Sequence, residues 1–589
     1  MEEKSVFCGS APARLIPGWT SDKMSGHGLC NPVHGPVCDI VWKKGTAMKT
    51  AFYNGLVYTG TLPLQQAFIV EDGRFLAVGS SEEILSSLTE KEQRVDLGGR
   101  FVCPGFNDSH MHLLSFGKLL RGAQLAAHTG SLSGMLSYLR TYLSEAGLQE
   151  GEWLQGRGWN QDLFSDTDRM PDRTDLDSVS TDVPILITRA CGHCCVLNSK
   201  ALSLADIHAG TAAPDGGSIG FRDGEPDGRL YENAIDLVQK ALPVPGRREI
   251  REMLKAACRA VNRYGITSVQ TDDYQVFPGL PWETVNAVYR EMEAQGELTV
   301  RVYEQAQFTK TQTLRAFMEA GNRTGTGSSL FRIGPLKIVA DGSLGSRTAH
   351  LSRPYADRPD TCGFSLYPES HLREMVRLAH VGGMQVAIHA IGDACLDQVL
   401  DAVEAALGES PRKDHRHGVV HCQITRPEQL ERIARLGMHV YVQSIFLDYD
   451  NHIVEKRAGT RLASSSYSWK TLLRRGVSVS NGSDCPVELP DVMAGIECAV
   501  TRTSRDGTGP YLPDQSFSVQ EALDSFTWRG AEASFEEDVK GRIEPGQAAD
   551  FVLLSGNPFE TESFQLHCIR AKKVYLGGKC VSEGSDSCL

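Results

Sequence analysis

Short apolar segments that each run into an amphipathic helical pattern recur between residues 101 and 484. The apolar segments have the length of buried strands: FVCPGFNDSH, ITSVQTD, LTVRVYEQAQF, FRIGPLKIVAD, MQVAIHA, GVVHC, MHVYVQS and VSVSNGSD. Segments between them, such as WETVNAVYREMEAQG and PEQLERIARLG, carry apolar residues at helical spacing and end near glycine. Eight such strand–helix units predict an α/β fold, a (β/α)₈ TIM-like barrel over residues 104–539.

Both ends of the chain carry strand and turn patterns without helices. AFYNGLVYT and AFIVEDGRFLAVG lie near the start, and Asp72-Gly73 within the second is a hairpin-turn signal. GRIEPGQAADFVLLS and IRAKKVYLGGKCV repeat this style near the other end. We expect residues 48–103 and 540–589 to pair into one small β-sandwich beside the barrel.

Two further regions interrupt the pattern. Roughly 150 residues separate the first predicted barrel strand from the second, far more than a βα loop needs. An inserted subdomain at about residues 115–245 is expected there, and it should cover the active site because loops that follow barrel strands lie at the catalytic face. Residues 1–47 are rich in Gly, Pro and Ser without periodicity, which predicts a loose tail.

Charge and composition narrow the class of protein. The chain has 60 Lys and Arg against 73 Asp and Glu, a net charge of −13, and no long basic segment, which disfavours nucleic acid and anionic membranes as partners. The start, MEEKSVFCGSAPARL, lacks the pattern of a signal peptide, and no window approaches the roughly 20 apolar residues of a membrane span. The 16 cysteines indicate reduced thiols rather than a disulfide framework. We therefore expect a soluble, cytoplasmic protein.

Metal-binding side chains recur where the predicted strands end. His110 and His112 close the first strand, and alternate strand residues point to the same side, so both rings can face one metal. His389, His421 and Asp484 end the fifth, sixth and eighth strands in the same way. Catalytic groups of a barrel lie at these strand ends, and His and carboxylate side chains are the usual ligands of Zn²⁺. The pattern predicts a divalent-metal site at the mouth of the barrel.

Lys337 lies within the apolar segment FRIGPLKIVADGS and has two interpretations. It could extend to solvent or form a salt bridge, for example with Asp341. Alternatively it faces the barrel interior, where its neutral amine could take up carbon dioxide and become a metal-binding carbamate.

Several segments together resemble the amidohydrolase superfamily, and within it amidohydrolase family 3, whose members include YtcJ-like proteins and N-substituted formamide deformylase. The segments are PGFNDSHMH, GWNQDLF with MPDRTDLDSV, GHCCVLNSKAL, DGRLYEN, GPLKIVADGSLGSRTA, VAIHAIGDACLD, RHGVVHCQI, GSDCPVE and GRIEPGQAADFVLL. Val420 stands where the family commonly has Glu, which leaves the ligands intact. Cys194 and Cys195 replace the residues usual after Gly-His, so the resemblance does not identify the substrate.

The resemblance implies roles for the residues at the strand ends. His110 and His112 would bind the more buried metal, His389 and His421 a neighbouring one, and carboxylated Lys337 would bridge the two. Asp484 would touch the buried metal and relay protons. A divalent metal, expected to be Zn²⁺ with one or two per chain, would activate water as hydroxide for attack on a carbonyl carbon.

The implied activity is hydrolysis of a carbon–nitrogen bond other than a peptide bond, in an amide, N-formyl or N-acyl substrate. A mononuclear deaminase or a cyclic amidase of the same superfamily remains an alternative, and a non-catalytic scaffold of this fold is a weaker one. The expected partner is a small-molecule substrate, and homodimer formation is left open.

The insertion contributes candidate substrate contacts. His193 either contacts substrate or caps a turn, and Trp159 and Gln161 in GWNQDLF resemble pocket residues of the family, although Trp159 could equally be core. Cys191 and Cys194 form a CxxC without a second pair at zinc-ribbon spacing, which disfavours a structural zinc. The loop that holds Asp341, Ser343 and Ser346 lacks the G-x-S-x-G motif of a serine nucleophile, so a supporting role is expected.

Overall fold

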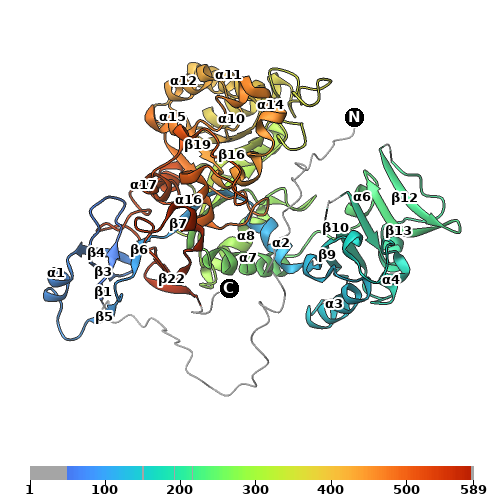
Figure 1. Ribbon diagram of the computed structural model, residues 1–589, viewed down its shortest axis with the longest axis horizontal. Helices are drawn as coiled ribbons and strands as arrows, with labels where there is room; N and C mark the ends of the chain where they lie inside the picture. The colour runs from blue at the N-terminus through green and yellow to red at the C-terminus, as the bar shows by residue number, and fades with distance from the viewer. Residues whose placement is uncertain (1–48, 149–150, 191–192, 215, 585–589) are drawn as a thin grey trace.

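The computed structural model describes residues 49–148, 151–190, 193–214 and 216–584 (Figure 1). The predicted tail, residues 1–47, and Cys191 of the CxxC lie outside these residues. Every cysteine within them is a free thiol, as expected of reduced cysteines. In the same residues, no helix combines the length and apolar composition needed to cross a membrane.

A nearly closed sheet of eight parallel strands forms the centre of the molecule, in the order β20-β19-β18-β17-β16-β15-β14-β7 (Figure 1). The strands are β7 (Phe106–Met111), β14 (Ile266–Thr271), β15 (Arg301–Gln307), β16 (Phe331–Val339), β17 (Val386–Ala390), β18 (Gly418–His421), β19 (His439–Val442) and β20 (Val479–Asn481). All eight predicted barrel strands contribute to this sheet. The prediction of a TIM-like barrel is therefore confirmed.

Helices follow the strands and pack around the sheet (Figure 1). They include α2 (Leu113–Arg121), α7 (Arg247–Asn262), α8 (Trp282–Ala294), α9 (Thr311–Glu319), α10 (Glu369–Val381), α11 (Asp393–Glu409), α12 (Pro427–Leu436), α15 (Trp469–Arg474), α16 (Val492–Thr501), α17 (Val519–Ser525) and α18 (Trp528–Ala533). Helix α12 shows how sequence sets these bounds. Pro427 occupies its first turn and Gly437 ends it in the left-handed conformation, with φ of 66°.

Polar contacts join the first and last strands of the barrel. Ser109 Oγ donates to the carbonyl of Asn481 at 2.8 Å, and Asp484 N donates to the carbonyl of His110 at 2.8 Å. The carboxylate of Asp108 accepts from the backbone N and the Oγ of Ser483 at 3.0 and 2.5 Å. These bonds bring the end of β20 against the end of β7, and so place Asp484 beside His110.

Two further sheets contain the terminal strands. One has the order β4-β3-β1-β5, with β1 (Thr50–Tyr53), β3 (Ala67–Glu71), β4 (Arg74–Gly79) and β5 (Gln93–Asp96). The other has the order β2-β6-β21-β22-β23, with β2 (Leu56–Val57), β6 (Phe101–Pro104), β21 (Phe551–Leu554), β22 (Ala571–Leu576) and β23 (Lys579–Glu583). Both contribute to one apolar cluster, in which Phe551 contacts Phe52 and Phe68. The β-sandwich and the exact domain limits stay predictions.

A six-stranded sheet follows α2 within the predicted insertion, in the order β12-β13-β11-β10-β9-β8. Its strands are β8 (Ala123–Gln124), β9 (Leu154–Trp159), β10 (Ile185–Arg189), β11 (Cys194–Leu197), β12 (Gly217–Arg222) and β13 (Glu225–Glu232), and its helices are α3 (Leu132–Glu145), α4 (Arg173–Asp177), α5 (Ser199–Leu204) and α6 (Ile235–Gln239). It lies on the other side of the barrel from β1, β3 and β4 (Figure 1).

Candidate metal centre

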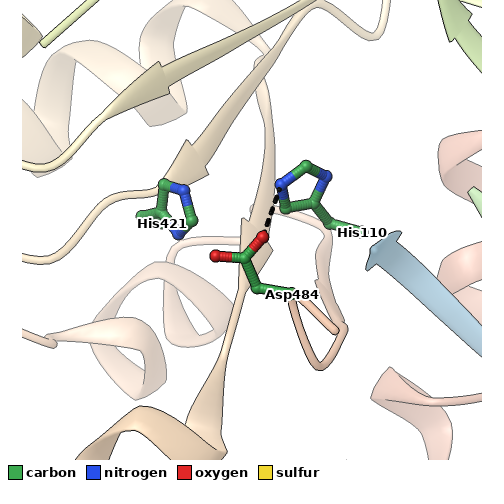
Figure 2. Close-up of side chains that lie close together, drawn as sticks. All are labelled: His110, His421 and Asp484. Carbon is green, nitrogen blue, oxygen red and sulfur yellow. Dashed lines mark ion pairs between the residues drawn. The ribbon is translucent and has the colours of Figure 1, made fainter. Parts of the chain in front are cut away.

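Three predicted ligands from different strand ends converge at the mouth of the barrel. Ligand atoms of His110, His421 and Asp484 all lie within 4.8 Å of one another, and all three residues are buried. Figure 2 shows the carboxylate of Asp484 between the two rings, with its Oδ1 atom 3.3 Å from His110 Nε2. Two imidazoles and one carboxylate are a donor set that suits Zn²⁺ and leaves room for a further ligand.

His112 and Lys337 lie next to this cluster. His112 Nε2 is 2.9 Å from Asp484 Oδ1, and Lys337 Nζ is 3.1 Å from His110 Nε2. Lys337 is only 1% exposed, which excludes the interpretation that it extends to solvent. Its ion-pair partner is Asp272 at 3.0 Å, directly after the end of β14, rather than the suggested Asp341.

His389 sits at the edge of the cluster. Its ring centroid is 4.4 Å from that of His421, yet its Nε2 atom is 3.1 Å from the carbonyl of Gly342 and 3.3 Å from Asp341. The structure thus brings all six predicted ligands together at the mouth of the barrel, with Nε2 of His389 facing the loop that contains Gly342.

The ligand-bearing segments have unusual backbone conformations. His421 and Asp484 have positive φ angles of 75° and 57°, which residues other than glycine rarely adopt. Between the strand and Asp484 lies Gly482, where an added Cβ would come within 2.6 Å of the backbone N of His110. Strain of this kind clusters at functional sites, where surrounding contacts hold it in place.

The electrostatic environment favours the metal-binding protonation states of His110, His421 and Asp484, whereas, against the effect of burial, Asp272 and Asp484 raise the pKa of His112 to about 10. Burial, aided by the charge of Lys337, lowers the pKa of His110 to about 4, so its ring is neutral near pH 7. Burial also lowers the pKa of His421 well below its usual range. Burial alone would raise the pKa of Asp484, but hydrogen bonds from His110 and His112 outweigh it and hold that pKa well below its usual range. Neutral imidazoles beside an ionised carboxylate are the states that bind a metal.

An oxygen acceptor holds the outer nitrogen of each clustered histidine. The Nδ1 atoms of His110 and His421 lie 3.3 Å from Gln305 Oε1 and 2.7 Å from Gln443 Oε1, and His112 Nδ1 contacts Asp272 Oδ1. Such outer contacts are typical of metal-binding histidines because they orient the ring and fix its tautomer.

These three partners are absent from the sequence-based prediction. Asp272 and Gln443 directly follow β14 and β19, and Gln305 lies near the end of β15. Their position at strand ends was the available signal, the same one that identified the histidines.

Comparison with known proteins agrees with this geometry. The model of the amidohydrolase family matches residues 93–582. The chain belongs to the amidohydrolase family. YtcJ of Bacillus subtilis (strain 168) is 34% identical over 551 residues, covering 91% of this chain and 100% of YtcJ. N-substituted formamide deformylase of Arthrobacter pascens is 26% identical over 87% of this chain and 94% of its own length. The solved structure of a metal-dependent hydrolase from Pyrococcus furiosus covers 87% of this chain and 100% of its own, with 27% identity and a TM-score of 0.73.

Within this amidohydrolase, the three candidate substrate residues lie in the insertion. His193 is exposed and its Nδ1 atom is 2.9 Å from Glu232. Gln161 accepts a hydrogen bond from Arg189 at 2.8 Å. Trp159 is fully buried in an apolar cluster of the insertion, which matches its alternative interpretation as a core residue. The contacts of all three lie within the insertion, so the structure does not join them to the metal-ligand cluster.

The loop after β16 supports the site rather than forming a nucleophile. The buried carboxylate of Asp341 accepts from the backbone N atoms of His350, Ile391 and Gly392 at 2.8–3.0 Å. Ser343 and Ser346 bond to each other, Oγ to Oγ, at 2.8 Å. Asp341 therefore ties this loop to the segment that follows His389, as expected of a supporting residue.

Proposed function

We propose that this amidohydrolase is a metal-dependent hydrolase that cleaves a carbon–nitrogen bond other than a peptide bond, in a substrate of the amide, N-formyl or N-acyl type. The observation that carries the proposal is the convergence of His110, His421 and Asp484 at the mouth of the barrel. Further support comes from the relative that is an N-substituted formamide deformylase and from the solved metal-dependent hydrolase.

His110, His421 and Asp484 would hold the metal, with His112 beside them, and we propose Zn²⁺ because of this donor set. When bound, the metal supplies a Lewis acid for a carbonyl oxygen and makes water a stronger acid. Lys337 is proposed to carry a carbamate that bridges two metals, since its Nζ atom already lies 3.1 Å from His110 Nε2.

Asp484 is the residue proposed to move protons. Its carboxylate is ionised, buried, and within 3.3 Å of two of the proposed ligand rings. A carboxylate in this position can accept a proton from the attacking water and deliver it to the leaving nitrogen. The leaving group then departs as a neutral amine.

A mononuclear deaminase or cyclic amidase is the second candidate. The observation that favours it is that the ligand atoms of His110, His421 and Asp484 alone lie within 4.8 Å of one another among the described residues, which is one group of ligands rather than two. In that case a single metal at His110, His421 and Asp484 would serve the reaction. Under either candidate we propose a small-molecule substrate, a cytoplasmic location, and no nucleic-acid or membrane partner.

The proposal is tested by assaying the metal-loaded protein against N-formyl, N-acyl and cyclic amides. We expect hydrolysis of at least one class, and Asp484→Asn should lower kcat by about 10²–10⁴-fold while most metal stays bound, because the amide keeps an oxygen but accepts no proton. Asp524→Asn is a matched control. Asp524 lies outside the ligand cluster, where its Oδ1 atom accepts a hydrogen bond of 2.7 Å from Tyr58 Oη. Near-normal turnover in Asp484→Asn would remove Asp484 from proton transfer, and inactivity against all three classes would contradict the substrate assignment.

A further inference from the structure

The carboxylate of Asp272 bonds two proposed ligands at once. Its Oδ1 atom contacts Nδ1 of His112, and its Oδ2 atom accepts from Lys337 Nζ at 3.0 Å. Asp272 is 2% exposed, so water cannot replace these contacts.

His112 depends on such a contact more than His110 does. The side chain of His112 is 29% exposed, whereas that of His110 is 1% exposed. A partly exposed imidazole can rotate, and when neutral it can carry its proton on either nitrogen. An acceptor at Nδ1 fixes the orientation of the ring and keeps a proton on that nitrogen, so Nε2 is the atom that faces the cluster.

We propose that Asp272 is a positioning residue for the metal centre, which holds His112 with Nε2 directed at the metal and holds Lys337 Nζ beside His110. The inference rests on the proposed function and adds a residue to it. With Nδ1 of His112 bound to Asp272, its Nε2 atom lies 2.9 Å from Asp484 Oδ1, which is also 3.3 Å from His110 Nε2. The Asp272 contact therefore directs a fourth donor atom at the same point.

The neighbours of Asp272 hold the backbone of the same segment. Helix α2 begins directly after His112, which makes no side-chain cap. Thr271 Oγ1 instead accepts from Leu113 N at 2.8 Å, and Asp273 Oδ1 accepts from Leu114 N at 2.9 Å. Asp272 thus fixes the ring of His112, while Thr271 and Asp273 satisfy the first N–H groups of the helix. Because Asp272 contacts the ring of His112 and Asp273 contacts the helix backbone, substitutions of these two adjacent residues form a matched pair.

The test is the affinity for Zn²⁺, measured by competition with a chromophoric chelator, in the wild type and in Asp272→Ala, Asp272→Asn and Asp273→Ala. We expect Asp272→Ala to bind Zn²⁺ about 10–100-fold more weakly, as for loss of other outer partners of ligand histidines. Asp272→Asn should fall between Asp272→Ala and the wild type, because its amide oxygen still accepts from His112 but its charge is lost. Asp273→Ala should lower the thermal midpoint of the metal-free protein while its Zn²⁺ affinity stays near that of the wild type.

Each outcome decides one point. Wild-type affinity in Asp272→Ala, or an equal loss in Asp273→Ala, would overturn the positioning role of Asp272 and leave the proposed function intact. A wild-type protein that binds no Zn²⁺ would overturn the proposed function and this inference with it. If Asp272→Ala does not fold in the presence of chelator, Asp272→Asn decides, because it preserves the shape of the side chain.

Discussion

Lys337 is the residue whose chemical state most affects the charge of the site. Four histidines and Asp484 supply little negative charge to two adjacent dications, so a carbamate on the lysine would stabilise the pair. We expect Lys337→Ala to lose metal and activity, and excess metal with a small carboxylic acid to restore part of both. Mass analysis of the active, two-metal protein checks the modification directly. An unmodified amine in that preparation would show that two metals bind without a carbamate, and would overturn this role of Lys337.

At the scale of residues, the sequence predicts the ligands better than their partners. His110, His421 and Asp484 could be identified because metal-binding side chains at the ends of apolar strands are unusual. Asp272, Gln305 and Gln443 could not be distinguished from other polar residues near strand ends. Which histidine each one contacts depends on the register and stagger of neighbouring strands, which a single sequence does not contain.

A second group of histidines links three barrel elements away from the metal centre. His417 Nδ1 accepts from Val386 N at 3.1 Å, so its Nε2–H donates to His380 Nδ1 at 2.8 Å. His415 Nδ1 accepts from His417 N at 2.9 Å, and its Nε2–H donates to the carbonyl of Leu436 at 2.8 Å. Each ring accepts at one nitrogen and donates from the other, so this arrangement requires neutral rings.

This arrangement predicts a loss of stability in acid. Burial, together with the charge of Arg412, lowers the pKa of His417 well below its usual range. The unfolded chain, with a His pKa of about 6.5, binds more protons below that pH, so the contribution is present above about pH 6.5 and is lost as pH falls. We expect the wild type to exceed His417→Asn in thermal midpoint at about pH 7.5, with a smaller difference at about pH 5. Parallel decline of both proteins would contradict this role of His417.

At the scale of elements, periodicity predicts the barrel strands and helices well, but it does not predict the boundary between β6 and β7. The segment FVCPGFNDSH reads as a single strand, whereas β6 ends at Pro104 and β7 begins at Phe106 in a different sheet. Gly105 between them is required because an added Cβ would come within 2.2 Å of Thr267 Oγ1. The close approach involves a strand about 160 residues away, which local sequence patterns do not reveal.

At the scale of the whole molecule, a buried ion pair joins the barrel to the five-stranded sheet that contains β6 and β21. Arg301 in β15 donates from Nε and Nη2 to Asp550 at 2.6 and 3.0 Å, and Asp550 also accepts from Gly577 N at 2.7 Å. We expect Asp550→Ala to destabilise the protein by about 3–5 kcal/mol, because it leaves a buried guanidinium without its partner. Thermal or urea unfolding measures the change, and Asp538→Ala at an exposed site is the control. A loss no larger than that of the control would show that the five-stranded sheet is not coupled to the barrel through this pair.

The sequence predicts least how the barrel, the insertion and the sheets of the terminal strands are arranged relative to one another. The sequence predicts the length of the insertion and its strands. The position of the insertion beside the barrel depends on packing of α2 against α7, which are about 130 residues apart. For that reason His193, Trp159 and Gln161 could be selected by motif while their distance from the ligands could not be judged.

Metal analysis of the purified, zinc-reconstituted protein tests the metal centre most directly. The wild type should retain about one or two Zn²⁺ per chain after removal of free metal, and His110→Ala and His421→Ala should each lose most of it, since each variant deletes a ligand. His193→Ala, at an exposed histidine of the insertion, should retain the wild-type amount. A wild type that retains no metal, or ligand variants that retain as much as His193→Ala, would contradict the assignment of a metal-dependent hydrolase site to the mouth of this barrel.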